Sequence, residues 1–372
     1  MTTSASTPPS GSSSGSSSGA PEYLDLGIDL TELTSTLVDI PSESGDEQLL
    51  ADLVESALTQ LTHLEVTRLG NTVIARTNFG HGERVILGGH LDTVPANNNL
   101  PSRLEGDRLY GLGTCDMKGG VAISLKLAAE LASASRDVTY LYYECEEVDS
   151  ARNGLAKVSQ SDPELLAGDF AILMEPSNAG VEAGCQGSLR FELAVPGQRA
   201  HSARSWMGSN AIHHAAPILN LLADYQPRVV EIDGLEYLEG LNAVGISGGV
   251  AGNVIPDATT VTINYRYAPS RSADEAVDYV TELFADYELT VVDNAGGAFP
   301  GLSEPAAQEF ASQVAEAPRP KYGWTDVSRF NDLGIPAVNF GPGDPSMAHH
   351  KDEFVEVTQL DSVYTALKNW LS

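Results

Sequence analysis

The chain has 372 residues, enough for two domains, and with 42% hydrophobic and 19% charged residues it has the composition of an ordinary globular protein. Its 51 acidic residues outnumber its 21 basic residues and give a formal net charge of -30. This charge argues against nucleic acids and anionic membrane surfaces as partners, because the electrostatic term would be repulsive.

Residues 1–22 are rich in serine, glycine and proline and lack the apolar core of a signal peptide, so we expect a disordered tail. No run of 18 apolar residues occurs, and the sequence predicts no transmembrane helix. Cys115, Cys145 and Cys185 are too few for a disulfide framework, and we expect them to be buried and reduced. These features together predict a cytoplasmic protein.

The first half of the chain alternates between strands and helices. Apolar residues recur at helical spacing from Asp46 to Leu61. Further predicted elements are strands at Val73–Arg76, Arg84–Gly88, Val138–Cys145 and Phe170–Met174, and helices at Gly120–Ser133 and after Ala151. This alternation predicts an α/β fold with a mixed, largely parallel sheet flanked by helices, in which ligands bind beyond the carboxyl ends of the strands.

The pattern changes near Gly187. Strands are predicted at Ser188–Val195, Leu241–Gly248, Thr259–Tyr267 and Glu288–Val292, and amphipathic helices at Asn210–Tyr225 and Ser272–Tyr287. Pro217 predicts a kink in the first helix, and Ser272 with Glu275 resembles a capping box at the start of the second. The order β-α-β-β-α-β predicts a ferredoxin-like α+β unit.

The α/β pattern then resumes, with a helix at Pro305–Ala317, a strand at Ala337–Phe340 and a helix from Gln359. We therefore expect one domain to be interrupted by another. The predicted division is a tail at residues 1–22, a metal-binding catalytic domain at 23–186 and 297–372, and an inserted domain at 187–296.

Histidine and carboxylate residues follow several of the predicted strands. His90 and Asp92 lie two residues apart and point the same way on an extended backbone, so Asp92 can hold one imidazole nitrogen while the other meets a metal. Taken alone, a His-x-Asp pair is more often structural than metal-binding. Asp116 follows a glycine-rich loop and could bridge two cations, or could simply cap the helix that starts near Gly120.

Glu146 and Glu147 are adjacent at the end of a predicted apolar strand. On an extended backbone they point in opposite directions, so one can bind a metal while the other acts as a base on water. Glu175 ends the next strand and repeats the pattern. Buried carboxylates at neighbouring strand ends are costly unless a cation compensates them, and this set predicts a pair of zinc ions.

The remaining histidines are less decisive. Either His349 or His350 can complete the second metal site, and spacing alone leaves the choice open. His201 lies in the insert, either as a simple loop histidine or as a group brought to the site when domains close. We expect structural or solvated roles for the others, which are His63, His81, His213 and His214.

Considered together, these motifs resemble the family of di-zinc amidohydrolases related to carboxypeptidase G2 and aminoacylase-1. The resemblance covers about Thr31 to Trp370. It is carried by Gly-His-Leu-Asp-Thr-Val-Pro (89–95), Asp-Met-Lys-Gly-Gly (116–120), Glu-Glu (146–147), Glu-Pro-Ser (175–177), Ala-His-Ser-Ala-Arg-Ser-Trp-Met-Gly (200–208), Gly-Asn-Val-Ile-Pro (252–256) and Trp-Thr-Asp-Val-Ser-Arg-Phe (324–330).

The resemblance implies metal ligands. His90 and Glu175 would bind one Zn²⁺ and Glu147 and His349 the other, with Asp116 bridging and Co²⁺ able to substitute. His349 is preferred to His350 because the family pattern His-x-x-Asp/Asn-Glu fits only from His349. A cis peptide bond after the bridging aspartate is also implied.

The resemblance also implies catalytic roles. Glu146 would be the general base, Asp92 would support the site beside His90, and His201 would stabilise the oxyanion from the partner subunit's insert. The insert would then be a lid and the interface of a homodimer.

Five residues match positions that contact substrate or differ from relatives in an informative way. Asn253, Arg266, Thr325 and Arg329 match positions that hold substrate carboxylates or the scissile carbonyl. Enterobacterial relatives have Gly-Arg-Arg-Gly-Ser where residues 184–188 read Gly-Cys-Gln-Gly-Ser, and a tyrosine in place of Arg204. We expect Arg204 to supply the missing cation, since a guanidinium binds a carboxylate through two parallel bonds.

The reaction that the resemblance implies is hydrolysis of N-succinyl-LL-2,6-diaminopimelate to succinate and LL-2,6-diaminopimelate, a step towards lysine and cell-wall synthesis. The small-molecule substrate is thus an N-acyl amino acid with several carboxylates. An alternative is a deacetylase or aminoacylase acting on an acetylornithine-like substrate, or a dipeptidase, since these share the metal motifs. A remote alternative is an inactive binding protein, although every expected site residue is retained.

Overall fold

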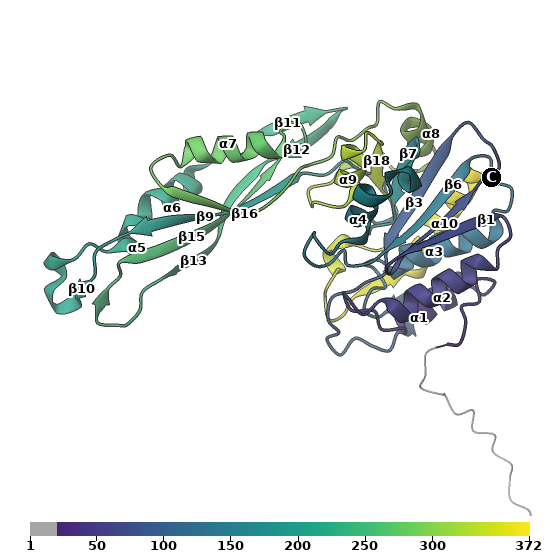
Figure 1. The fold of residues 1–372 in the computed structure, drawn as a ribbon, viewed down its shortest axis with the longest axis horizontal. Coiled ribbons are helices and arrows are strands. Elements are labelled where there is room, and N and C mark those ends of the chain that lie inside the picture. The colour runs from purple at the N-terminus through teal and green to yellow at the C-terminus, as the bar shows by residue number, and fades with distance from the viewer. Residues whose placement is uncertain (1–20) are drawn as a thin grey trace, which may run out of the picture.

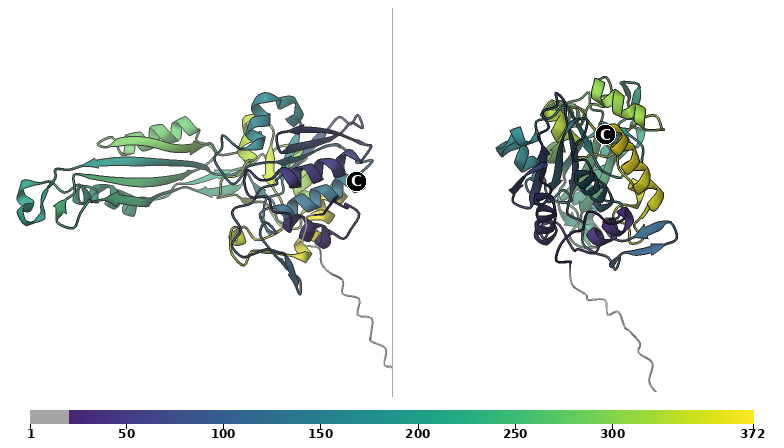
Figure 2. Two further views of the ribbon diagram at one scale, coloured as in Figure 1. Left: turned by 60° about the horizontal axis from the view of Figure 1, so that its bottom comes forward. Right: turned by 90° about the vertical axis from the view of Figure 1, so that its right-hand side faces the viewer.

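The computed structural model describes residues 21–372, so the predicted tail lies outside the described residues except for Pro21 and Glu22. A larger α/β body carries the carboxyl end of the chain, and a narrower arm extends from it (Figures 1 and 2). No helix within residues 21–372 is both long and apolar enough to cross a membrane.

The larger body is built on an eight-stranded sheet with the order β1-β2-β6-β3-β7-β18-β8-β17. Its strands are β1 (Leu64–Leu69), β2 (Thr72–Thr77), β3 (Arg84–His90), β6 (Asp137–Tyr143), β7 (Phe170–Leu173), β8 (Glu182–Ala183), β17 (Arg319–Pro320) and β18 (Ala337–Asn339). The four central strands β6, β3, β7 and β18 are parallel, whereas β1 and β2 pair antiparallel at one edge. The predicted mixed, largely parallel sheet is confirmed.

Helices cover both faces of this sheet. One face packs against α1 (Leu30–Val38), α2 (Gln48–Thr59), α3 (Lys118–Glu130), α8 (Pro305–Gln313) and α10 (Val357–Leu371). The other packs against α4 (Gly154–Ser161), the 3₁₀ helix η1 (Pro163–Leu166) and α9 (Val327–Asp332). Every residue of β6 is buried, as expected for a central strand covered on both sides.

A small three-stranded sheet lies beside the carboxyl-terminal helix. It consists of β4 (Arg103–Glu105), β5 (Arg108–Tyr110) and β19 (Phe354–Glu356), and the short helix η3 (Pro345–Met347) precedes β19. β5 comes shortly before Asp116 in the chain, and β19 comes shortly after His349. Because β5 and β19 pair, this sheet holds together the two chain segments that carry Asp116 and His349.

The arm contains a four-stranded antiparallel sheet with the order β13-β15-β9-β16. Its elements are β9 (Gly187–Pro196), α5 (Ala211–His214), α6 (Ala216–Asp224), β13 (Gly240–Gly248), β15 (Ala258–Tyr267), α7 (Ala273–Leu283) and β16 (Glu288–Ala295). The helices pack on one face, over a core that includes Phe191, Ile263 and Phe284. This is the predicted ferredoxin-like arrangement.

Two features of the arm extend beyond that unit. A hairpin of β11 (Val229–Ile232) and β12 (Leu235–Leu238) was not predicted and lies where the arm meets the body. At the opposite end, β10 (Ala200–His201) pairs with β14 (Val254–Ile255), next to the 3₁₀ helix η2 (Ser202–Met207) (Figure 1).

Local predictions in the arm are also confirmed. The helix expected at Asn210–Tyr225 is divided at Ala215, just before Pro217, and the Ser272–Glu275 capping box is present.

One prediction about a strand end is wrong. β6 stops at Tyr143 rather than at Cys145, whose φ of 57° lies in the left-handed region and is incompatible with an extended strand. Glu146 and Glu147 therefore lie in a loop, and the expected alternation of an extended backbone does not apply to them.

Candidate active site

Parallel strands bring the predicted site residues to one edge of the large sheet. His90 is the last residue of β3, where it pairs with Tyr143 at the end of β6. Because β7 runs parallel on the other side of β3, the segments that contain Glu147 and Glu175 leave the sheet at the same edge. The carboxyl ends of three central strands thus converge, as expected for a site in an α/β sheet.

Asp116 lies between two imidazoles. Its Oδ1 is 3.1 Å from Nε2 of His90, and its Oδ2 is 3.5 Å from Nε2 of His349. The same His349 nitrogen is 2.8 Å from Oε1 of Glu147. Donor atoms of His90, Asp116 and Glu147 lie within 4.8 Å of one another. The alternative role of Asp116 as a helix cap is not observed, since α3 begins at Lys118 and its preceding residue makes no side-chain cap.

Two further carboxyl groups lie beside this cluster, those of the buried Glu175 and the half-buried Glu146. Burial raises the pKa of Glu175 to about 8, and the neighbouring Asp116 carboxylate contributes. Burial also raises the pKa of Glu146 well above its ordinary value, with further contributions from the charges of Asp326, Glu175 and Glu147. These carboxyl groups are crowded and poorly solvated, which is an environment that cations stabilise.

The pKa values of the two imidazoles are raised as well, which favours their charged forms. Hydrogen bonds to Asp116 and Glu147 raise the pKa of His349 to about 10. Burial opposes protonation of His90, but Asp116, Asp92 and Glu175 together raise its pKa well above 6.5. In the protein alone, protons on the imidazoles balance the carboxylates. Divalent cations would replace those protons, and the mixture of imidazole and carboxylate donors suits zinc.

An outer layer of hydrogen bonds orients the cluster. Nδ1 of His90 is 3.0 Å from the backbone oxygen of Asp92 and 3.5 Å from its Oδ1, so Asp92 lies beside the imidazole as expected. The Asp92 carboxylate also accepts hydrogen bonds from the backbone N–H groups of Glu146 and Glu147, at 2.9 and 3.0 Å, and from the Ser44 hydroxyl at 2.7 Å. Asp92 therefore also holds the Glu146–Glu147 loop in position, a second role that the sequence did not predict.

Glu353 is another support that the sequence did not predict. It is buried, and its Oε1 accepts hydrogen bonds from the backbone N–H groups of Cys115 and Asp116, at 2.9 and 3.1 Å. In the sequence, the only indication of a role for Glu353 was its position four residues after His349. The cis peptide bond predicted between Asp116 and Met117 is present.

Residues 86–372 match the model of peptidase family M20/M25/M40, which is most of the chain. The chain belongs to this family. It is 54% identical over 351 residues to a provisionally named succinyl-diaminopimelate desuccinylase of Mycobacterium tuberculosis, covering 94% of this chain and 99% of the relative. It is 49% identical over 360 residues to the succinyl-diaminopimelate desuccinylase of Corynebacterium glutamicum, covering 94% and 98%.

Solved structures of M20 proteins share the fold. An M20 metallo-carboxypeptidase of Sulfolobus solfataricus superposes with a TM-score of 0.77 at 16% identity, covering 92% of this chain and 98% of that one. A Bacillus subtilis protein described as a dinuclear metal binding peptidase of the M20 family gives 0.67 at 18% identity, covering 92% and 96%. By its family, this chain is a metal-dependent hydrolase.

Three predicted residues do not join the cluster within one M20 chain. His201, Arg204 and Asn253 are exposed and lie at the far end of the arm, where β10 pairs with β14 (Figures 1 and 2). Nδ1 of His201 accepts a hydrogen bond from the backbone N–H of Ala203 at 3.1 Å, and Asn253 accepts one from Ser202 through its backbone oxygen. The three residues lie together, away from the metal ligands.

The other predicted substrate contacts lie near the junction of arm and body. Thr325 is buried and its hydroxyl donates to Asn339 at 2.9 Å. Arg329 makes an ion pair with Asp326 and donates to the Ser150 hydroxyl at 3.0 Å. Arg266, on β15, is half-buried. Arg266 and Arg329 line one cavity, which also includes the segment directly after Glu147.

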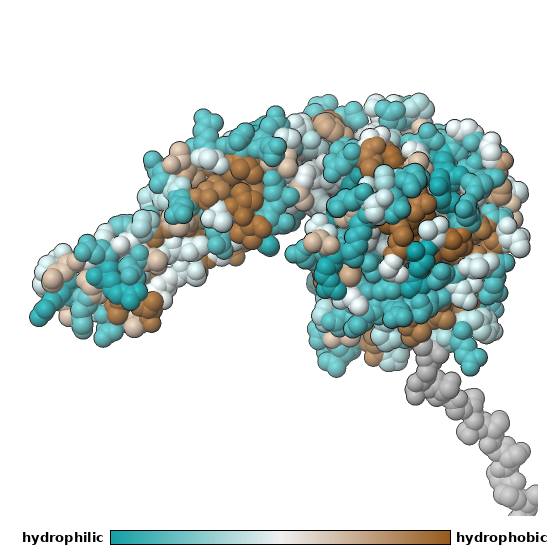
Figure 3. Space-filling model, in the orientation of Figure 1, coloured by the Kyte–Doolittle hydropathy of each residue, from teal (hydrophilic) through white to brown (hydrophobic). Residues whose placement is uncertain are grey.

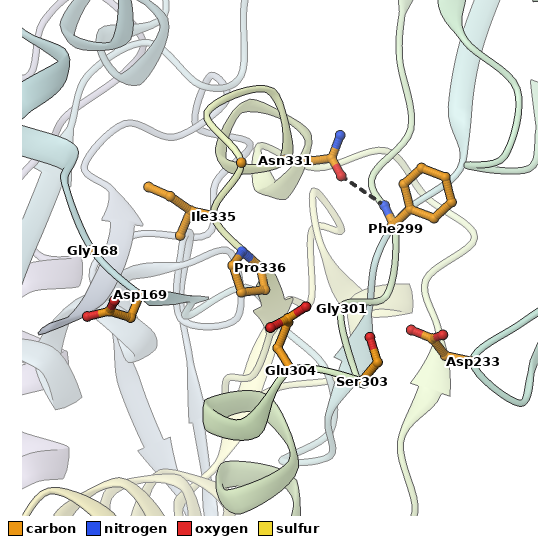
Figure 4. A pocket seen from close by; sticks show the side chains of 11 residues that line it. Gly168, Asp169, Asp233, Phe299, Gly301, Ser303, Glu304, Asn331, Ile335 and Pro336 are labelled. Atoms are coloured by element: carbon orange, nitrogen blue, oxygen red, sulfur yellow. Dashed lines mark hydrogen bonds between the residues drawn. The ribbon is translucent and has the colours of Figure 1, made fainter. Parts of the chain in front are cut away.

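A separate hollow of about 570 Å³ contains none of the predicted site residues. Asp169, Phe299, Glu304 and Asn331 are among the residues that line it (Figure 4). The side chain of Asn331 accepts a hydrogen bond from the backbone N–H of Phe299 at 3.3 Å and closes one side. Its lining includes carboxylates but no histidine, so this hollow lacks the imidazoles gathered at the sheet edge.

Proposed function

We propose that this M20 protein hydrolyses N-succinyl-LL-2,6-diaminopimelate to succinate and LL-2,6-diaminopimelate. The observation that carries the proposal is Asp116 with its two oxygens facing His90 and His349, beside the half-buried Glu146. Such an arrangement suits a two-metal amide hydrolase. The substrate follows from the two desuccinylases to which almost the whole chain is similar.

The metal centre would hold two Zn²⁺ ions, with Co²⁺ able to substitute. His90 and Glu175 would bind one ion, Glu147 and His349 the other, and Asp116 both. When bound, the ions supply a Lewis acid for the amide carbonyl and lower the pKa of water. The contacts of Asp116 with both imidazoles and of His349 with Glu147 support this pairing.

Glu146 would act as the general base. Its carboxylate takes a proton from the attacking water and then delivers that proton to the leaving amine nitrogen, while the amide C–N bond breaks and a C–O bond forms. Asp92 holds the backbone of Glu146 and so positions the base. Burial favours the neutral form of the Glu146 carboxyl, which makes it suitable for the second, proton-donating step.

His201 would stabilise the oxyanion and would come from a second subunit. Within one chain β10, which carries His201, lies at the end of the arm away from the body (Figure 1), and this supports delivery of His201 by the arm of another subunit. The arm offers a surface for such a homodimer. Hydrophobic side chains are exposed on it (Figure 3), including Val244 and Ile246 on the edge strand β13.

The substrate would be held by side chains from both subunits. Arg204 and Asn253 lie beside His201 at the tip and would arrive with it. Arg266, Thr325 and Arg329 lie near the junction in the first subunit. Their guanidinium and hydroxyl groups suit the carboxylates and scissile carbonyl of a succinylated diamino acid.

A hydrolysis panel tests the substrate assignment. Zinc-containing protein is incubated with N-succinyl-LL-2,6-diaminopimelate, N-acetylornithine and simple dipeptides, and the released amine is measured. We expect kcat/KM for the first substrate to exceed the others by at least about 100-fold. Cleavage of acetylornithine or a dipeptide without cleavage of the first substrate would overturn the assignment and leave the mechanism unaffected.

A further inference from the structure

One face of the arm sheet is not covered by helices. Along β9 and β15 the side chains alternate, and the helices pack over the apolar set that includes Leu189 and Tyr265. The opposite face carries Ser188, Arg190 and Arg266. This face turns polar where the arm joins the body.

That polar face forms a wall of the cavity at the junction. The cavity has a volume of about 790 Å³ and is lined by β9, β15 and β16 of the arm, by residues 148–150 and by the segment around Trp324 and Arg329. Residues 148–150 directly follow the expected metal ligand Glu147. The cavity is therefore a neighbour of the reaction centre, and of a size suited to part of a small substrate.

Arg190 and Arg266 contribute two guanidinium groups to this wall. Arg190 is paired with Asn264 in the β9–β15 register, and Arg266 lies two residues beyond Asn264 on the same face. Arg266 donates one hydrogen bond, from Nε to Oδ1 of Asn264 at 3.2 Å, and within residues 21–372 neither guanidinium forms an ion pair. Both guanidinium groups can therefore pair with the carboxylate of a bound ligand.

A carboxylate lies on the other side of Arg190. Asp293, on β16, is paired with Arg190 in the β9–β16 register and also lines the cavity, yet the two side chains form no ion pair in the described chain. The wall therefore presents cationic groups and an anionic group that are not neutralising each other. A ligand with both a carboxylate and an ammonium group would match this arrangement better than a simple dicarboxylate.

We propose that this cavity binds the distal amino-acid group of the substrate, with Arg190 and Arg266 on its carboxylate and Asp293 on its ammonium group. This inference rests on the proposed function and identifies Arg190 and Asp293 as specificity residues that the sequence did not indicate. Two guanidinium groups can bind one carboxylate through several charge-assisted bonds. The succinyl end would then lie on the other side of the scissile amide.

Matched substrates test the assignment. N-succinyl-L-lysine lacks the distal carboxylate, and N-succinyl-L-2-aminopimelate lacks the distal ammonium group. Arg190→Ala should lower kcat/KM for N-succinyl-LL-2,6-diaminopimelate by about 10- to 100-fold and change hydrolysis of N-succinyl-L-lysine by less than about threefold. Asp293→Asn should lower kcat/KM for the diaminopimelate substrate and leave that of the aminopimelate substrate unchanged.

Two control variants separate recognition from folding. Arg190→Lys keeps the charge without the planar fork and should recover part of the loss. Arg228→Ala removes an exposed guanidinium of the arm that does not line this cavity and should change neither substrate. Equal losses on both substrates in Arg190→Ala would overturn the inference, because Arg190 would then bind the succinyl end or act structurally.

Calorimetry with free LL-2,6-diaminopimelate distinguishes this inference from the proposed function. The zinc-containing protein should bind LL-2,6-diaminopimelate at least about tenfold more tightly than L-lysine, and Arg190→Ala should abolish that preference. If hydrolysis fails but this preference is found, the proposed reaction is wrong and the subsite stands. If hydrolysis succeeds but Arg190→Ala keeps the preference, the subsite is wrong and the reaction stands.

Discussion

Asp92 accepts a hydrogen bond from the backbone N–H of Glu147 over 3.0 Å, and so one buried carboxylate connects the His90 strand to the loop of the expected base. Its other oxygen accepts from the Glu146 N–H at 2.9 Å. Because Cys145 turns this loop with a φ of 57°, the loop has no strand partner to hold it. The position of Glu146 therefore depends on Asp92.

Replacing Asp92 should disturb the base more than the fold. In Asp92→Asn, one acceptor oxygen becomes an amide donor that faces a backbone N–H, so the loop loses a hydrogen bond and Glu146 moves. We expect kcat to fall by about 10- to 100-fold, with the protein still folded. Steady-state kinetics with circular dichroism measures both quantities.

Ser44→Ala provides the control, since it removes a hydroxyl that donates to Asp92 and keeps the carboxylate. Its kcat should fall by less than about fivefold. If both variants lose the same activity, the backbone hydrogen bonds of Asp92 are not what positions the base.

Glu353→Gln should weaken metal binding. Glu353 holds the backbone N–H groups of Cys115 and Asp116, and a glutamine keeps an acceptor without the negative charge. We expect the zinc dissociation constant to rise by about tenfold or more, because such outer contacts orient metal ligands. Competition with a zinc chelator measures the change. Asp352→Asn, at the exposed neighbouring position, should bind zinc as the wild type does.

Asp137 should stabilise the fold in a pH-dependent way. Burial alone would raise its pKa, but hydrogen bonds from the Phe79 and His81 N–H groups and the Thr77 hydroxyl lower it. A carboxyl with a lowered pKa binds fewer protons when folded. Its contribution is therefore complete above the unfolded pKa of about 4 and is lost as the pH falls through the folded pKa.

Urea unfolding of Asp137→Asn checks this effect. The variant should be less stable than the wild type by about 2 kcal/mol at pH 7, and the difference should shrink as the pH falls below about 4. A difference that stays constant down to pH 3 would show that charge at Asp137 is not responsible.

Mixed dimers should reveal whether His201 acts across subunits. His201→Ala and Glu146→Gln homodimers should each be nearly inactive. After subunit exchange, half of the dimers are mixed, and each contains one site with both residues intact, so about one quarter of wild-type activity should return. No recovery despite proven exchange would mean that His201 and Glu146 act within the same chain.

Most of the metal site could be predicted from the sequence because its residues end apolar strands. His90 ends a strand, and Glu147 and Glu175 come after strands, that are recognisable from their apolar runs, and parallel strands necessarily bring their carboxyl ends together. The separate ferredoxin-like sheet was also predictable from the pattern of apolar residues. Its period-2 and helical patterns are regular.

Residues that act through long-range backbone contacts could not be predicted. Glu353 bonds to N–H groups 237 and 238 residues away, and Ser44 bonds to Asp92 from a loop, so no local pattern marks either. Arg190 has the spacing of an ordinary solvent-facing strand residue, and only the junction with the body gives it a cavity. The β11–β12 hairpin has strands of four residues, too short for a clear period.

The central claim is that Glu146 drives a metal-dependent removal of succinate. The most direct test is the rate of succinate release from N-succinyl-LL-2,6-diaminopimelate by wild type and Glu146→Gln, with the zinc content of both samples determined. The wild type should release succinate with two zinc ions bound, and Glu146→Gln should lose at least about 1000-fold in kcat while retaining both ions. Wild type with two bound zinc ions that releases no succinate, or a Glu146→Gln variant of undiminished activity, would contradict the account.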